Sequence, residues 1–158
     1  MRKAVKIAGL ILVVALIIAQ FIQPDTNLHE QASEHDLLNT FEVPDQVASL
    51  LKNSCYDCHS NHTRYPWYSK ISPLSWYLYK HIEEGKEALN FSEFGLLEKR
   101  KMVSGLSGVC ELIESGSMPL VSFTIIHRDA RLDEDEQSII CKWSEAEAGK
   151  LLKSGPGS

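Results

Sequence analysis

Five consecutive residues, Cys55-Tyr56-Asp57-Cys58-His59, constrain the fold of this 158-residue chain more than any other feature. Two thiols three positions apart, with an imidazole directly after the second, share one helical turn and therefore lie close together. This pattern is typical of c-type haem attachment, in which the thiols form thioethers and the histidine binds the iron. The sequence thus predicts one covalent haem c, with Cys55 and Cys58 as anchors and His59 as the proximal iron ligand.

Other uses of a Cys-x-x-Cys pair fit this sequence less well. A closed zinc site needs two more ligands, and the remaining cysteines, Cys110 and Cys141, do not form a second close pair. A thioredoxin-like redox pair needs a βαβ context, which the sequence does not predict. A disulfide between Cys55 and Cys58 would leave His59 without a role. Cys110 and Cys141 either form a disulfide between two helices or remain two buried, inert thiols.

The first 22 residues are basic and then apolar. Arg2, Lys3 and Lys6 precede a stretch from Ile7 to Ala19 that contains no charged side chain. Counted from Ala4, the segment is close to the roughly 20 residues of a spanning helix. We therefore expect a transmembrane helix in residues 1–22, with the N-terminus cytoplasmic and the domain in the periplasm. The alternative is a signal peptide that is cleaved on export to the periplasm.

The rest of the chain is predicted to be all-α, with a polar tether at 23–36, one domain at 37–152 and a flexible tail at 153–158. A short helix starts at Pro44 and runs into the motif. Another spans Leu74 to about Lys86.

A third predicted helix carries an apolar stripe from about Phe94 to Ser115 and stops at Gly116. Asp133 and Glu136 form a capping box that starts the last helix. A weak alternation over Val121–Ile126 is the nearest approach to a strand pattern.

The second axial position of the iron decides what a haem can do. Met118 is the first candidate for this distal ligand, because it opens a loop after Gly116 and is stiffened by Pro119. A Met opposite a His raises the reduction potential and suits electron transfer. His127 is the next candidate and His81 the third, and either would give a lower potential.

Aromatic and basic residues after the motif are candidates for haem contacts. Trp67 and Tyr68 could pack on the porphyrin, and Arg64 and Lys70 could meet the propionates. The same aromatic residues do not indicate a nucleic-acid site, because the chain has a net charge of −5 and no basic face.

Several short motifs occur in an order that extends over residues 38–150. They are Ser54 to Asn61, Tyr65-Pro66-Trp67-Tyr68, Ile71 to Trp76, Leu89 to Phe94, Gly116-Ser117-Met118-Pro119 and His127 to Leu132. In this order the chain resembles the small haem-binding-domain proteins of bacterial envelopes, which are common in Bacteroidetes. The resemblance implies a cytochrome c-like domain. His127-Arg128 departs from the His-Pro of that family.

These observations favour a membrane-tethered carrier of single electrons, not an enzyme, with envelope redox proteins as donor and acceptor. A peroxidase-like enzyme is one alternative, although His127 has no obvious Arg or Gln partner for acid–base work. A haem-based sensor with an exchangeable sixth ligand is the other, and it would need a partner protein.

Overall fold

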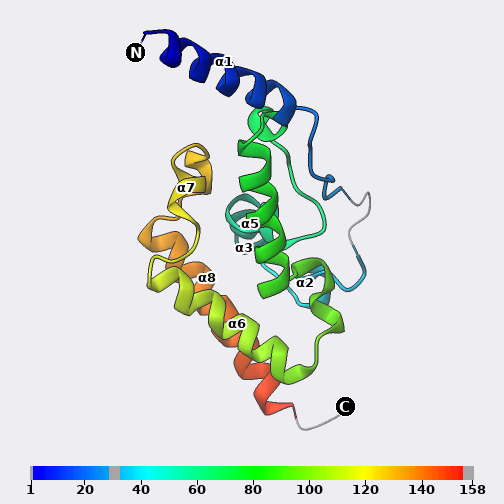
Figure 1. Cartoon of the computed structure of the whole chain (residues 1–158). Coiled ribbons are helices and arrows are strands. Elements are labelled where there is room, and N and C mark those ends of the chain that lie inside the picture. The colour runs from blue at the N-terminus through cyan, green and yellow to red at the C-terminus, as the bar shows by residue number, and fades with distance from the viewer. Residues whose placement is uncertain (1, 29–32, 155–158) are drawn as a thin grey trace.

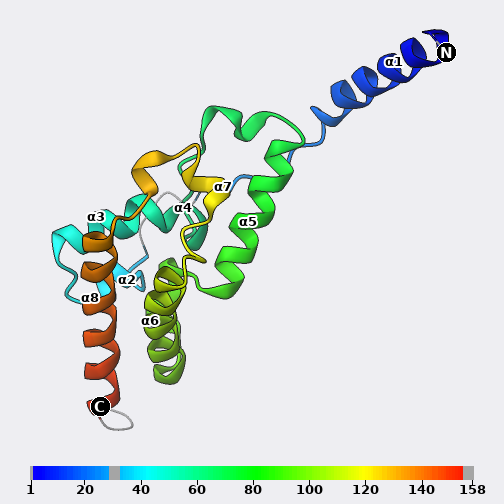
Figure 2. The same cartoon turned by 90° about the vertical axis from the view of Figure 1, so that its left-hand side faces the viewer.

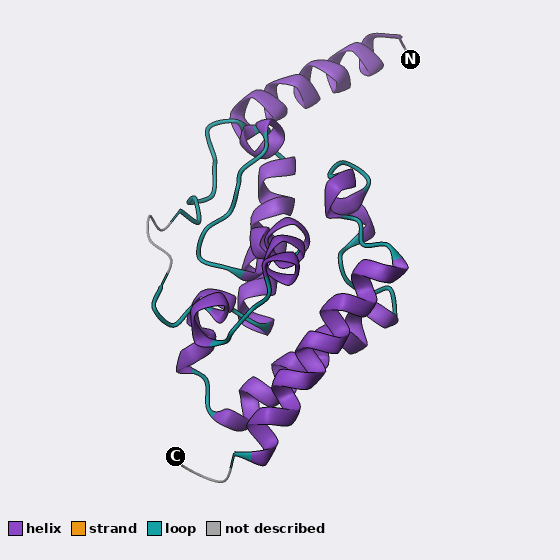
Figure 3. Ribbon diagram, turned by 180° about the vertical axis from the view of Figure 1, so that it is seen from behind, coloured by secondary structure: helices purple, strands orange, loops and turns teal. Residues whose placement is uncertain are grey.

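Helices form the regular elements of the computed structural model, which describes residues 2–28 and 33–154 (Figure 1). In chain order they are α1 (Arg2–Ala19), α2 (Leu37–Thr40), α3 (Asp45–Ser54), α4 (Tyr56–His59), η1 (Trp67–Lys70), α5 (Leu74–Ala88), η2 (Phe91–Leu96), α6 (Lys99–Glu114), α7 (Val121–Thr124), η3 (Arg128–Ala130) and α8 (Glu134–Lys153). These residues contain no strand (Figure 3) and one isolated bridge, between Leu28 and His62. The predicted all-α class is confirmed for the described chain.

The prediction of a transmembrane helix is wrong. No helix within residues 2–28 and 33–154 is both long enough and apolar enough to cross a membrane. α1 is helical but has 18 residues, of which Arg2, Lys3 and Lys6 are charged. The prediction counted Lys6 as part of the span, and three cations leave an apolar stretch shorter than the roughly 20 residues required. None of the residues of α1 is buried, and the helix projects from the rest of the molecule (Figure 2).

The two longest helices of the domain, α6 and α8, lie side by side and antiparallel (Figures 1 and 3). Their apolar faces form one core together with residues of α2, α3 and η2. The buried members of this core are Leu37, Val47, Leu51, Phe91, Phe94, Leu106, Ile113, Leu132, Ile140, Trp143 and Ala148. Burial of each large side chain contributes about 1.5–3 kcal/mol, so this core holds the helix pair against the α2–α3 segment.

A disulfide joins Cys110 of α6 to Cys141 of α8, with a Cα–Cα distance of 4.7 Å. Of the two predicted alternatives for these cysteines, the structure therefore has the bridge. The Glu114 carboxylate lies within 4.8 Å of both sulfurs. Sulfurs that are bonded to each other do not offer thiolates to a metal, so this group does not form a zinc site.

Local signals placed several helix ends correctly. α8 begins with the predicted capping box, in which the Glu136 amide donates to Asp133 (2.8 Å) and the Asp133 amide donates to Glu136 (3.0 Å). Gly116 follows α6 with φ +70°, a left-handed conformation that favours glycine at a helix end. α3 begins at Asp45, one residue later than predicted, with Pro44 as its N-cap residue.

Two segments differ from the prediction. The helix expected from about Phe94 to Ser115 is divided into η2 and α6, which leaves Leu96 outside the buried stripe and 62% exposed. The weak alternation over Val121–Ile126 belongs to the short helix α7 and its C-terminal turn. The packing of η2 on α2 accounts for the first difference, since η2 ends before α6 begins. The alternation in the second segment is too weak to form a strand.

The first part of the predicted tether is bonded to the domain. We call residues 20–28 the N-terminal strap. Gln20 Nε2 donates to the Ser72 carbonyl (3.0 Å), and Gln23 Nε2 donates to the Ser72 hydroxyl (2.9 Å). The Trp76 indole N–H donates to the Ile22 carbonyl (2.7 Å). Residues 29–32 of the tether and 155–158 of the predicted tail lie outside the described residues.

Candidate functional site

The Cys-x-x-Cys-His motif forms a helical turn of its own. α3 ends at Ser54, and Cys55 departs from helical geometry (φ −127°, ψ −43°) before α4 begins. The Cys58 and His59 amides both donate to the Cys55 carbonyl, at 3.1 and 3.0 Å. This turn keeps the three side chains at positions i, i+3 and i+4, on one face. Both motif cysteines are free thiols and are half-buried.

α5 packs directly on the motif because it carries a glycine at the contact. A Cβ placed on Gly85 would lie 2.6 Å from the Cys58 carbonyl oxygen, a distance that real Cβ atoms do not show. Any other residue at position 85 would push the motif away from α5. Gly85 thus allows the Cys58 backbone to pack against α5 at a distance that a side chain at position 85 would prevent.

His59 is oriented by the backbone that follows α5. Its Nδ1 lies 3.0 Å from the Leu89 carbonyl oxygen, so Nδ1 carries the proton and Nε2 keeps its lone pair. Burial lowers the pKa of His59, and the Leu89 and Gly85 carbonyls oppose this shift. A neutral imidazole with its second nitrogen held by a carbonyl is the usual state of a histidine that binds a metal.

A cavity of about 620 Å³ lies beside α4 and extends along α6. Cys55, His59 and Met118 all line it, although they come from two segments far apart in the sequence. The remaining lining is mostly apolar and includes Ala88, Leu89, Phe91, Leu96, Leu97, Gly105, Gly108, Val109, Leu112 and Ile113. The volume is within the range of cofactor sites. Cys58, whose backbone α5 covers, is not among the lining residues.

The residues of this cavity fit a haem. One neutral imidazole and one thioether line the same apolar space, and this is the axial pair of electron-transfer cytochromes. Gly108 of α6 also lines the cavity, and a Cβ at this position would meet no heavy atom within 4 Å. A glycine in the middle of a helix costs about 1 kcal/mol relative to alanine, and here its bare backbone leaves room for a flat ligand.

The two motif thiols are protonated at neutral pH. Burial raises the pKa of Cys55 to about 12, with a smaller contribution from the charge of Cys58. Burial also raises the pKa of Cys58 to about 11, with a smaller contribution from Asp57. Redox-active cysteine pairs have depressed pKa values instead. The surroundings of the motif therefore disfavour a redox-active dithiol.

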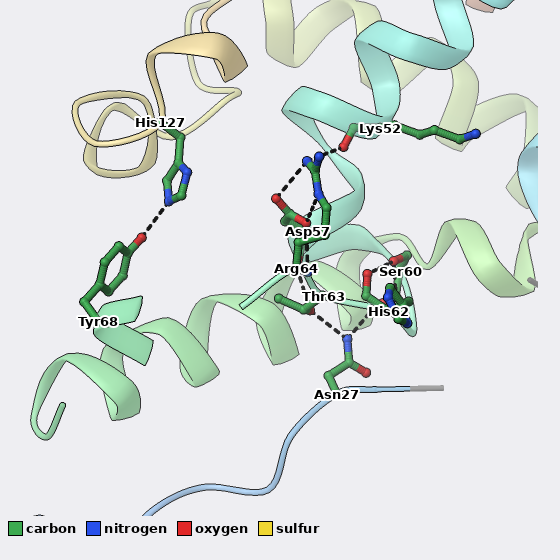
Figure 4. Close-up of polar contacts among 9 residues, drawn as sticks. All are labelled: Asn27, Lys52, Asp57, Ser60, His62, Thr63, Arg64, Tyr68 and His127. Carbon is green, nitrogen blue, oxygen red and sulfur yellow. Dashed lines mark hydrogen bonds and ion pairs between the residues drawn. The ribbon is translucent and has the colours of Figure 1, made fainter. Parts of the chain in front are cut away.

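None of the four residues predicted to contact the haem from the loop after the motif, Arg64, Trp67, Tyr68 and Lys70, lines the cavity. Arg64 forms a two-pronged ion pair with the motif residue Asp57 (3.0 and 3.1 Å) and donates to the Lys52 carbonyl (2.8 Å), as Figure 4 shows. Trp67 is 81% exposed. Tyr68 is directed at His127 (Figure 4). The cavity lining instead includes the cations Lys86 and Lys101.

The three candidates for the distal ligand lie in different places. Met118 lines the cavity with His59, whereas His127 and His81 do not. The His127 Nε2 lies 2.8 Å from the Tyr68 hydroxyl, and its ring stacks on Phe123. The His81 Nδ1 lies 3.3 Å from a Glu84 oxygen on the same helix. Of the three, Met118 is the one that the fold brings to the cavity of His59.

Sequence reasoning missed the residue that ties the N-terminal strap to the motif. Asn27 is 6% exposed, and its Nδ2 donates to the Ser60 carbonyl (2.8 Å) and the Thr63 hydroxyl (3.0 Å), as in Figure 4. Its amide donates to the Tyr65 hydroxyl (2.7 Å), and its Oδ1 accepts from Lys86 (3.2 Å). A lone Asn in a polar stretch gives no local signal for this role.

The motif is also held from its other side by partners without a sequence signature. The Thr63 hydroxyl donates to the Asp57 carbonyl (2.7 Å). The Asn61 backbone amide donates to the Ser92 hydroxyl (3.1 Å), and the Asn90 side-chain amide donates to Asn61 Oδ1 (2.9 Å). Together with the bond from His59 to the Leu89 carbonyl, these contacts fix α4 against the 89–92 segment.

Comparison with known proteins agrees with this geometry. A family model described as a haem-binding domain matches residues 14–146. Searches of curated proteins and of solved structures each found no match. The family match runs from within α1 to within α8 and includes the motif, the cavity and Met118. The chain therefore belongs to the haem-binding domain family.

Proposed function

We propose that this haem-binding protein carries a covalent c-type haem and transfers single electrons. The observation that carries the proposal is that Cys55, His59 and Met118 line one apolar cavity. A haem with His and Met axial ligands supplies a one-electron couple whose potential the Met raises. The protein residues hold, orient and shield this group.

In this proposal, Cys55 and Cys58 are the covalent anchors. Each would hold the porphyrin through a thioether, in which the sulfur and the hydrogen of the thiol add to the two carbons of a vinyl group in place of its π bond. Such an addition needs reduced thiols and no oxidant. Both thiols are free in the structure.

His59 and Met118 are the proposed axial ligands. The Leu89 carbonyl holds the proton of His59 on Nδ1, which leaves Nε2 for the iron. Met118 is held by backbone bonds, because its own amide and that of Ser117 donate to the Leu112 carbonyl at the end of α6 (both 3.0 Å). Residues of η2 and α6 supply most of the apolar lining that would surround the group.

An electron carrier accounts for these residues better than a peroxidase-like enzyme does. A peroxidase needs an open sixth position and an acid–base group beside it. His127, the residue considered for that role, is bonded to Tyr68 and does not line the cavity. Met118, whose thioether could occupy the sixth position, lines the cavity together with His59.

We further propose that the domain works outside the cytoplasm, in the periplasm, with other exported redox proteins as donor and acceptor. The disulfide between Cys110 and Cys141 supports this compartment, because disulfides persist where the surroundings are oxidising. The basic and then apolar N-terminal segment is also compatible with a cleaved export signal.

An optical and extraction experiment tests this proposal. The protein should be produced with haem attachment, and we expect a reduced-minus-oxidised spectrum of thioether-linked haem. Acidified organic solvent should leave the haem on the denatured chain. Release of the haem into the solvent would contradict covalent attachment.

Substitution of Met118 tests the distal ligand. Met118→Ala should abolish the weak near-infrared band of a Met–iron bond in the oxidised protein. Met102→Ala is the matched control, because Met102 is a half-buried methionine of α6 that packs on the core. The assignment is wrong if the band persists in Met118→Ala.

A further inference from the structure

The chain that follows Met118 has little packing to hold it in place. Between Met118 and His127, Thr124 is the one buried residue. The aliphatic side chains of Val121, Ile125 and Ile126 are 65%, 62% and 58% exposed. A segment with so few buried contacts has low local stability. Its position therefore depends strongly on the bonds at its two ends.

The first end is fixed by α6 through the bonds that the Ser117 and Met118 amides donate to Leu112. The second end is held by the contact between Tyr68 and His127 and by η3, which packs on α3 and buries Ala130. The Tyr68 hydroxyl and His127 Nε2 lie 2.8 Å apart, and the His127 ring stacks on Phe123 of α7 with centroids 4.4 Å apart. His127 thus links α7, through Phe123, to the Tyr68 hydroxyl.

Tyr68 belongs to the part of the chain that follows the motif. It lies in η1, which packs on α5, and α5 packs on α4. Burial raises the pKa of Tyr68, and the nearby Cys58 and Asp57 add to the shift. The Tyr68 hydroxyl therefore keeps its proton at neutral pH. The bond from Tyr68 to His127 joins the segment that follows the motif to the segment that follows Met118 (Figure 4).

We propose that Tyr68 and His127 form a latch that positions the loop of Met118, and that the latch sets how firmly Met118 holds the sixth iron position. This proposal rests on the function proposed above. It makes Tyr68 and His127 positioning residues, which touch neither the iron nor the cavity. It also gives His127 a role other than that of an alternative ligand.

Tyr68→Phe tests the latch, because it removes the hydroxyl and keeps the ring. A net hydrogen bond of about 1 kcal/mol corresponds to about a fivefold change in an equilibrium. We therefore expect imidazole to displace Met118 from the oxidised haem about fivefold more readily, measured as loss of the near-infrared band during titration. Tyr77→Phe, a half-exposed tyrosine of α5, is the matched control and should behave as the wild type.

Hydrogen exchange gives a second readout that does not need haem chemistry. In Tyr68→Phe, amides of residues 121–127 should exchange about fivefold faster, while those of α8 keep their protection. His127→Phe should reproduce both effects and retain the band of the Met–iron bond in the absence of imidazole.

The outcomes separate this proposal from the function on which it rests. Wild-type protein without the band would contradict the axial ligation itself. Wild-type protein with the band, and unchanged imidazole displacement in Tyr68→Phe and His127→Phe, would overturn the latch alone. Wild-type protein that lacks the band and has a bis-imidazole spectrum, which His127→Phe abolishes, would make His127 the ligand and overturn both the axial ligation and the latch.

Discussion

At the scale of single residues, buried hydrogen-bonding groups determine how the motif is held. Asn27 is the clearest example, because its side chain and backbone reach Ser60, Thr63, Tyr65 and Lys86. A carboxamide that is nearly inaccessible to water must have its bonds made within the protein, since an unsatisfied buried polar group costs about 1–3 kcal/mol. Asn27 therefore stabilises the turn that directly follows His59.

Replacement of Asn27 should show this. Asn27→Ala removes both donor bonds and leaves the Ser60 carbonyl without its partner, so we expect a loss of about 2–3 kcal/mol in the free energy of unfolding. Urea denaturation followed by circular dichroism measures it. Asn39→Ala is the control, because Asn39 makes one exposed bond to the Ser33 carbonyl and should lose less than about 0.5 kcal/mol. Equal losses in the two variants would contradict the role given to Asn27.

At the scale of elements, the packing of α5 on α4 determines where the motif lies. The backbone of Cys58 fits under α5 only because position 85 has no side chain. A comparable glycine, Gly149 of α8, has no heavy atom within 4 Å of its built Cβ. The two glycines thus share a helical conformation and differ in what surrounds them.

This pair gives a matched prediction. Gly85→Ala should destabilise the protein by about 1–3 kcal/mol, because its methyl group overlaps the Cys58 carbonyl. Gly149→Ala should stabilise it by up to about 1 kcal/mol through helix propensity alone. Thermal unfolding of the two variants measures the difference. A Gly85→Ala protein as stable as Gly149→Ala would refute the close packing.

The sequence predicted those features of the elements that depend on near neighbours. The capping box of α8, the stop at Gly116 and the extent of α5 each follow from residues within one or two turns. The same holds for the motif, whose spacing already places Cys55, Cys58 and His59 on one turn.

Features that depend on distant contacts could not be predicted in this way. The group that orients His59 is the backbone carbonyl of Leu89, and every residue has such a carbonyl, so the sequence does not indicate which one His59 meets. Arg64 is near the motif in sequence, yet it pairs with Asp57 and does not line the cavity. The cations that line the cavity, Lys86 and Lys101, are brought there by the fold from positions farther along the chain. For the same reason the sequence predicts a membrane segment for residues 20–22 of the strap and a tether for the rest, since the bonding partners of the strap lie some 30–50 positions away.

At the scale of the whole molecule, one covalent link joins the two longest helices of the domain. The disulfide between Cys110 and Cys141 spans 31 positions of sequence. A cross-link that closes a loop of this length stabilises the fold by about 3–4 kcal/mol in the chain-entropy model, because it restricts the unfolded chain.

Removal of the bridge should lower stability by about that amount. We expect Cys110→Ala combined with Cys141→Ala to lose about 3–4 kcal/mol in urea unfolding. Reduction of the wild-type protein with a phosphine should cause a similar loss, and the same treatment should leave the double variant unchanged. A wild-type protein that is insensitive to the reductant would contradict the prediction.

The bridge has a further consequence for how the cysteines are sorted during folding. Four cysteines permit three ways of forming two disulfides, and every one of them consumes the thiols of Cys55 and Cys58. The native chain uses one bridge and leaves those two thiols free. Once the packing of α6 on α8 has brought Cys110 and Cys141 into their disulfide, neither has a free thiol that could pair with Cys55 or Cys58. The helix pair thus protects the motif from mispairing, although the bridge takes no part in the cavity.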